Sequence, residues 1–180
     1  FFFVDMAYHS AGSIQGVTMA YWEIARSLKY KNFPVMFHTE YNGGFGQFEE
    51  NGTQKAYQIE NAFLNGPEYT WNSKDFSRGY TLQLLHKYIQ GKHNFSFQIT
   101  GIWYLHLADN KLTFTGYTDF WREDFQSGNK TTKFCFNAEP QIWCNISSHF
   151  SLGGEVELDN NFAGQHGFHA MPTLGAQYTF

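Results

Sequence analysis

The sequence predicts an all-β protein, a closed antiparallel transmembrane β-barrel of about ten strands that forms one domain over residues 1–180. Three observations support this prediction. Aromatic residues make up 20% of the chain and charged residues only 16%, yet the mean hydropathy is negative, at −0.45. No stretch approaches the roughly 18 consecutive apolar residues of a membrane helix. The last stretch, residues 168–180, alternates between apolar side chains and small or polar ones, as a strand between lipid and a wet interior would.

The same period-2 alternation appears along the whole chain. It predicts strands at 1–9, 17–28, 35–42, 59–71, 80–90, 97–107, 112–123, 133–142, 150–158 and 168–180. Arg26 falls on an apolar face, which is tolerable near a membrane edge because a long side chain can reach the interface. Gly66–Pro67 and Pro140 predict local irregularities, since proline has no N–H to donate.

The predicted connections alternate in length, as they do in outer-membrane barrels. Turns are expected near 29–34, 72–78, 109–111 and 145–148 on one side. The other side receives longer segments, at 10–16, 43–58, 91–94, 122–132 and 159–167. The segment 43–58 is the longest predicted loop, because it is rich in glycine and charge.

The closing strand ends in Tyr-x-Phe and resembles the assembly signal of bacterial outer-membrane barrels. Further stretches are similar to a family of small Bacteroidota outer-membrane proteins of unknown function, grouped with the nucleoside-specific Tsx-type channels. These stretches are AYWEIARSL, EYNGG, KYIQGKHNFSFQITGIWYL, YTDFWRED and NNFAGQHGFH. The resemblance implies an integral protein of the Gram-negative outer membrane. By the resemblance, Tsx-type channels are larger, with about twelve strands. Because the sequence opens at Phe1 inside a strand-like run, a removed signal and a further strand pair before Phe1 are compatible with the resemblance.

The side chains predicted to face inward are the candidate solute-binding residues of the lumen. They are Asp5, Glu23, His38, Glu40, Gln83, Lys87, Tyr104, Tyr117, Asp119, Lys133, Asn137, Glu139 and Glu155. Carboxylates and amides could bind a small polar solute, with Tyr21, Tyr104, Tyr117 and Trp121 as stacking faces. With the resemblance, this set predicts passive, nucleoside-specific diffusion, with no cofactor, no metal and no catalysis.

Two alternatives stay open. The charges could instead pair and fill the interior of so small a barrel, which predicts a non-conducting accessory subunit with a protein partner in an envelope complex. His149 and Ser151 share a face, as in outer-membrane lipid-modifying hydrolases, but no third orienting group is visible. The net charge of −4 argues against a nucleic-acid partner. His166 and His169 lack a third metal ligand.

The two cysteines, Cys135 and Cys144, are expected to be free thiols. On one continuous strand they would lie about 30 Å apart and on opposite faces, far beyond the reach of a disulfide.

Overall fold

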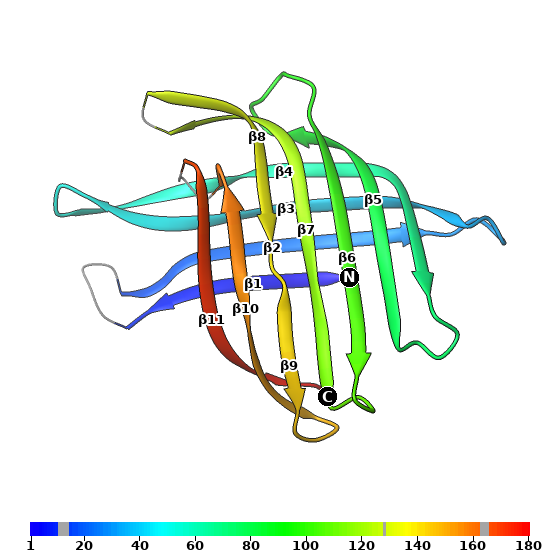
Figure 1. Ribbon diagram of the computed structural model, residues 1–180. Coiled ribbons are helices and arrows are strands. Elements are labelled where there is room, and N and C mark those ends of the chain that lie inside the picture. The colour runs from blue at the N-terminus through cyan, green and yellow to red at the C-terminus, as the bar shows by residue number, and fades with distance from the viewer. Residues whose placement is uncertain (11–14, 128, 163–165) are drawn as a thin grey trace.

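The computed structural model describes residues 1–10, 15–127, 129–162 and 166–180, and all regular structure in them is β (Figure 1). In chain order the strands are β1 (Phe2–His9), β2 (Gly16–Leu28), β3 (Val35–Glu50), β4 (Thr53–Asn72), β5 (Arg78–Ile89), β6 (Phe97–Leu107), β7 (Leu112–Ser127), β8 (Lys130–Ala138), β9 (Gln141–Asn145), β10 (Phe150–Asn160) and β11 (Phe168–Tyr178). The described residues contain no helix that is long and apolar enough to cross a membrane.

The strands form one antiparallel sheet in which neighbours in sequence are neighbours in space. β8 and β9 together occupy a single position, because both pair with β7 on one side and with β10 on the other. Eleven strands therefore make ten passages, as the alternation predicted. The predicted eighth strand is broken between Ala138 and Gln141, so the expectation of an irregularity at Pro140 is confirmed and that of one continuous strand is wrong.

The predicted loop at 43–58 is wrong. β3 and β4 run through it as a long hairpin that is closed only by Asn51 and Gly52. Both residues have positive φ, 53° and 74°, which is the geometry of the two-residue turns that favour Asn-Gly. The glycines at 43, 44 and 46 lie inside the hairpin, where each would-be Cβ meets a neighbouring atom within 2.4 Å. Close strand packing, rather than a flexible loop, accounts for them.

The predicted loop at 122–132 is likewise mostly strand. β7 continues to Ser127 and β8 begins at Lys130, with a bulge between Arg122 and Phe125. At Gly66–Pro67 the pairing of β4 with β5 is interrupted, but the register on both sides is the same. The expected irregularity at Gly66–Pro67 is therefore confirmed as a gap in the β4–β5 pairing, without the register shift of a bulge.

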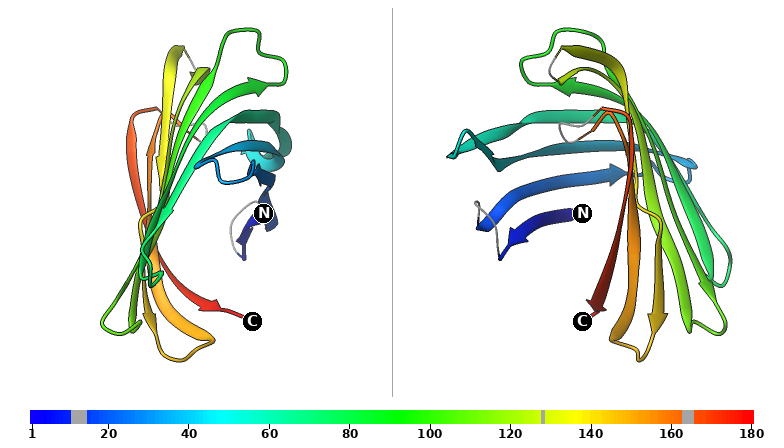
Figure 2. Two further views of the ribbon diagram at one scale, coloured as in Figure 1. Left: turned by 90° about the vertical axis from the view of Figure 1, so that its right-hand side faces the viewer. Right: turned by 60° about the vertical axis from the view of Figure 1, so that its left-hand side comes forward.

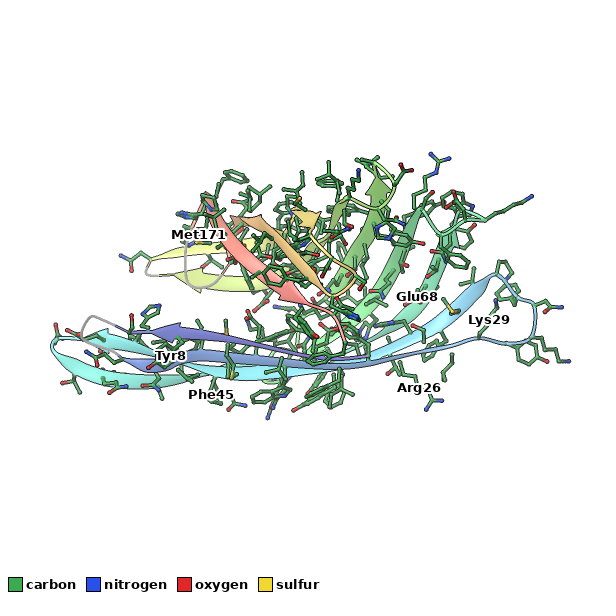
Figure 3. The ribbon with its side chains drawn as sticks, turned by 90° about the horizontal axis from the view of Figure 1, so that it is seen from below. Tyr8, Arg26, Lys29, Phe45, Glu68 and Met171 are labelled. Atoms are coloured by element: carbon green, nitrogen blue, oxygen red, sulfur yellow. The ribbon has the colours of Figure 1, made fainter. Side chains whose placement is uncertain are left out.

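The sheet curls until its first strands lie across the concave side of its last strands (Figure 2). Both chain ends lie on the open side of the curl, where β1 and β11 are the two edge strands. In the view from below, side chains fill the space between the two layers. Figure 3 shows Glu68 between the layers, and Phe45 and Arg26 on the outside of the lower layer.

The two faces of the sheet have opposite polarity. The apolar face lies outside and the polar face inside, which is the reverse of the arrangement in a water-soluble protein. Large apolar side chains cover the outside on every strand longer than five residues; Leu174 is 97% exposed, and Ile24, Phe63, Leu84 and Ile142 are also exposed. The inside buries polar groups, with His38 5%, Glu40 7% and Asp159 2% exposed. A small apolar cluster lies among them: Ala62, Leu64, Leu85 and Ile89.

Candidate functional site

The inner face is crossed by a row of polar side chains that pair strand by strand. Antiparallel register places Glu68 opposite Gln83, Gln83 opposite Thr100, and Thr100 opposite Asp119. The row continues through Asn137 and Asp159. We call these six residues the polar row. Side chains at paired positions share a face, so residues far apart in sequence form one continuous wall.

At one end of the polar row, Glu68 holds a dense hydrogen-bonded cluster. Its Oε2 accepts hydrogen bonds from Ser27 Oγ and Gln83 Nε2, each 2.8 Å away. His38 lies between two carboxylates, with Nδ1 2.8 Å from Glu68 Oε2 and Nε2 3.2 Å from Glu40 Oε2. The other oxygen of Glu40 accepts from Asn42 at 2.8 Å. The cluster links β2, β3, β4 and β5 on the inner face.

Lys87 begins a second chain of contacts beside the polar row. Its Nζ donates to Gln98 Oε1 at 2.9 Å and lies 4.6 Å from the centre of the Trp121 ring. Gln98 Nε2 then donates to Thr100 at 3.1 Å, and Thr100 Oγ1 donates to Asp119 at 2.5 Å. Asp119 also lies near enough to Glu40, across the interior, to interact with its charge. The two walls therefore approach each other at this level.

The far end of the row is equally interlocked. Asn137 Nδ2 donates to Asp159 at 2.8 Å, and Tyr117 donates its hydroxyl hydrogen to Glu139 at 2.6 Å. Gln141 Nε2 donates to Glu155 at 2.7 Å. Most inner carboxylates thus have protein partners, and the interior is a network rather than a row of free charges.

The structure brings most of the predicted lumen residues to this face. His38, Glu40, Gln83 and Asn137 are buried, and the half-buried set is Glu23, Lys87, Tyr104, Tyr117, Asp119, Glu139 and Glu155. Asp5, on the edge strand β1, and Lys133, near the β7–β8 hairpin, are exposed, and Asp5 lies near enough to Glu139, across the interior, for their charges to interact. Glu68, which organises the largest cluster, was missed because Gly66–Pro67 obscured the register of its strand.

The aromatic residues that were predicted to stack on a solute differ in how accessible their rings are. Trp121 is only 5% exposed, since Lys87 covers its ring and the Phe162 ring packs against it edge-on at 5.3 Å. Trp121 therefore has no open ring face on which a solute could stack. Tyr104 lies over Gly79, whose would-be Cβ is 2.5 Å from its ring, and donates to Asn72 at 2.8 Å. Trp143, which the sequence analysis did not select, has a comparable position over Gly153.

A hollow of about 520 Å³ opens at the turn end of the inner face. The β4–β5 turn contributes Asp75 and Ser77, the β6–β7 turn contributes Asp109, and the inner face contributes His106 and Asn145; Phe76 and Asn110 complete the lining. Hydrogen bonds from Ser73 and Ser77 lower the pKa of Asp75 from 3.8 to about 2 by stabilising its ionised form.

At the opposite end, Lys92 fastens the segment between β5 and β6 to its neighbours. Its Nζ forms a salt bridge with Glu60 at 3.2 Å and another with Glu123. Partial burial lowers the pKa of Lys92, but the hydrogen bonds and charges of Glu123 and Glu60 outweigh that effect, so its pKa is raised overall. This end of the interior is therefore tied across β4 and β7.

Two weaker sequence signals do not assemble into sites. His149 Nδ1 lies 2.9 Å from the Thr179 carbonyl oxygen, whereas Ser151 donates to Asn145 at 2.8 Å, so the two side chains have different partners. Among the described residues, no group of three or more His, Cys, Asp or Glu is arranged to hold a metal ion. Cys135 is buried, Cys144 is exposed, and both are free, as expected.

The comparison with protein families gives one match. Residues 1–180 match the model of a family described as "Domain of unknown function (DUF5020)". The chain belongs to this family. Neither the search of curated proteins nor the search of solved structures finds a match. Because the family match spans every strand from β1 to β11, the curled sheet with its polar inner face coincides with one family unit.

Proposed function

We propose that this DUF5020 protein spans a lipid bilayer as a closed β-barrel, in the outer membrane of a Gram-negative bacterium. The main support for this proposal is that the sheet has its apolar side chains outside and its polar side chains inside. Burying one Leu, Ile or Phe side chain is worth roughly 1.5–3 kcal/mol, and exposed examples occur from β1 to β11. Leaving them all in water would cost more than the roughly 5–15 kcal/mol by which folded domains are stable. Contact with lipid removes that cost.

Ten passages suit closure. With an even number of antiparallel passages, β1 and β11 run in opposite directions and can pair as neighbours in an antiparallel ladder. Unpaired strand edges cannot face hydrocarbon, because each unsatisfied backbone group costs several kcal/mol there. Closure between β1 and β11, directly or through additional strands, therefore completes the barrel.

For the interior we propose passive passage of a small, polar, uncharged solute of the nucleoside class. Supporting features are the amides, hydroxyls and half-buried aromatic rings of Tyr104 and Tyr117 on the inner face. Inner carboxylates outnumber inner cations, which disfavours phosphorylated solutes. No covalent chemistry enters this mechanism, in which weak successive hydrogen bonds move the solute along the wall.

The test is reconstitution of the purified protein in planar bilayers, after folding and insertion have been verified by protease protection in liposomes. We expect small conductance steps that adenosine or thymidine blocks in a saturable way. Inserted protein that neither conducts nor admits radiolabelled nucleoside would overturn the transport proposal. Protein that stays water-soluble and monomeric would overturn the membrane proposal as well.

One observation favours a second candidate, a non-conducting accessory barrel. The Glu68 cluster and the Lys87 chain line the interior where opposite walls approach. If this network seals the barrel, the wild-type protein is silent, whereas the double variant Glu68→Ala, Lys87→Ala conducts. A silent wild type with a conducting variant supports the second candidate; conduction by the wild type contradicts it.

A further inference from the structure

Trp143 lies flat against the inner face on a floor of two glycines. In the sheet register Trp143 is opposite Gly153 on β10, and Gly153 is opposite Gly175 on β11. A Cβ placed at Gly153 would be 2.8 Å from Cε3 of the indole, and one at Gly175 would be 3.2 Å from Cη2. The ring therefore extends sideways over both strands, and its other face is turned to the interior.

Hydrogen-bonding groups surround this ring on the same face. Trp143 Nε1 donates to Gln141 Oε1 at 3.0 Å, which fixes the orientation of the indole. Gln141 in turn donates to Oε2 of Glu155 at 2.7 Å. Asn145 Oδ1 accepts from Ser151 at 2.8 Å on the neighbouring passage. Oxygen acceptors thus border the platform along two strands.

The hollow at the turn end adjoins this platform. Asn145 lines the hollow and lies two residues from Trp143 on β9; His106, also in the lining, pairs with Thr113, which is itself opposite Trp143. Its volume of about 520 Å³ falls within the roughly 300–1,000 Å³ of small-molecule sites. The indole itself is not part of this lining and extends toward β10 and β11, so a ligand that uses both the hollow and the ring must reach past Asn145.

We infer that Trp143 and the adjoining hollow form a binding site for a neutral sugar ring. The C–H face of a sugar stacks on the electron-rich face of an indole, and its hydroxyl groups donate to carboxylate and amide oxygens such as those of Glu155 and Asn145. None of the described residues that line the hollow is Lys or Arg, and Asp75 and Asp109 are acidic. Anionic sugars are therefore disfavoured. The inference rests on the proposed function only in that a solute reaches the inner face of the sheet.

Calorimetric titration of the folded, detergent-solubilised full chain tests this site, with glucose, galactose, maltose and adenosine as probes. We expect saturable binding of at least one sugar, at least tenfold weaker binding in Trp143→Ala, and weaker binding in Glu155→Gln. Trp71→Ala is the matched control, because Trp71 lies on the outer face beside Tyr80 and its loss should leave sugar affinity unchanged. Gly175→Ala should weaken binding mildly by lifting the indole.

The outcomes separate this inference from the transport proposal. Folded protein that binds no sugar, or binds sugar equally well as Trp143→Ala, overturns the sugar site. Adenosine bound more tightly than every sugar, with the same loss in Trp143→Ala, overturns the sugar assignment but supports a nucleoside solute. Sugar binding by protein that inserts without conducting or transporting supports the site and contradicts transport.

Discussion

At the residue scale, Glu68 illustrates how the inner face is held together. One carboxylate oxygen meets Ser27, His38 and Gln83, which come from three other strands. Each of these hydrogen bonds replaces a hydrogen bond to water, so its net contribution to the free energy of folding is modest. Removing the shared acceptor is costlier, because several buried groups then lose their partner together.

Glu68→Ala should lower the free energy of unfolding by about 3 kcal/mol, since each buried group left unpaired costs about 1–3 kcal/mol. Urea unfolding in detergent micelles, followed by tryptophan fluorescence, measures the change. Glu49→Ala, in the exposed part of the β3–β4 hairpin, is the control and should stay within about 0.5 kcal/mol of wild type. Equal stability of the two variants would contradict the role assigned to Glu68.

Asp75 gives a pH-dependent prediction outside the strands. Its pKa of about 2 lies below its ordinary value of 3.8, so the ionised form stabilises the folded turn. That contribution is complete above about pH 4 and is lost as the pH falls toward 2. In an NMR titration the Ser77 amide should shift with a midpoint near 2, and Ser77→Ala should move the Asp75 midpoint upward. An Asp75 midpoint near 3.8 in the wild type would refute the prediction.

At the scale of elements, the β3–β4 hairpin shows why the connections look different from the sequence prediction. Its strands run to Glu50 and from Thr53, so a segment rich in glycine and charge is ordered by cross-strand pairing. The aromatic pair Phe48 and Tyr57, with ring centres 6.1 Å apart, lies near its tip. The long connections of this protein are therefore extended hairpins as well as loops.

Gly52→Val should destabilise the tip of this hairpin by about 1–2 kcal/mol, because a β-branched residue disfavours positive φ. No atom lies within 4 Å of the added Cβ, so the cost is conformational and not a clash. Hydrogen exchange at Glu50 and Thr53 should accelerate, while exchange in β6 is unchanged. Gly52→Asn, which tolerates this conformation, is the control. Slow exchange in Gly52→Val would rule out the two-residue turn.

At the scale of the whole molecule, polarity decides the environment of the sheet. Leu174 on β11 is almost fully exposed outside, and its neighbour Thr173 points inward, beside Glu155 on β10. The same charge placed at these two positions therefore meets different surroundings. A water-soluble sheet would make the outer position the more tolerant one, and a membrane barrel reverses that order.

Leu174→Arg should reduce the stability of the protein folded in liposomes by about 2–4 kcal/mol, the cost of a cation near the bilayer midplane on a lipid-facing strand. Thr173→Arg should cost much less, because the inner face is polar. Denaturant titrations in vesicles compare the two. If Leu174→Arg is neutral and Thr173→Arg is destabilising, the outer face is not in lipid.

The proposed closure of the barrel also has a direct readout. In lipid vesicles, the backbone amides of β1 and β11 should exchange about as slowly as those of the central strand β6, since closure gives both edges a partner. Deuterium uptake by mass spectrometry reports each strand. Fast exchange confined to β1 and β11 in vesicle-bound protein would contradict closure.

The sequence by itself determined the class of fold and the polarity of its faces. Alternation with period 2 is a property of single strands, so it identified the number of passages and the inward side chains, His38, Gln83 and Asn137 among them, without knowledge of neighbours. Proline likewise acts locally, and Pro140 marked the break between β8 and β9.

Only the tertiary structure decided which of these side chains meet. The polar row from Glu68 to Asp159 depends on the register of successive strand pairs, and a shift of one residue in any pair would turn a strand's polar side chains outward. The burial of Trp121 and the glycine floor under Trp143 also depend on atoms from other strands. Local patterns specify a face, whereas a site requires the registers that bring several faces together.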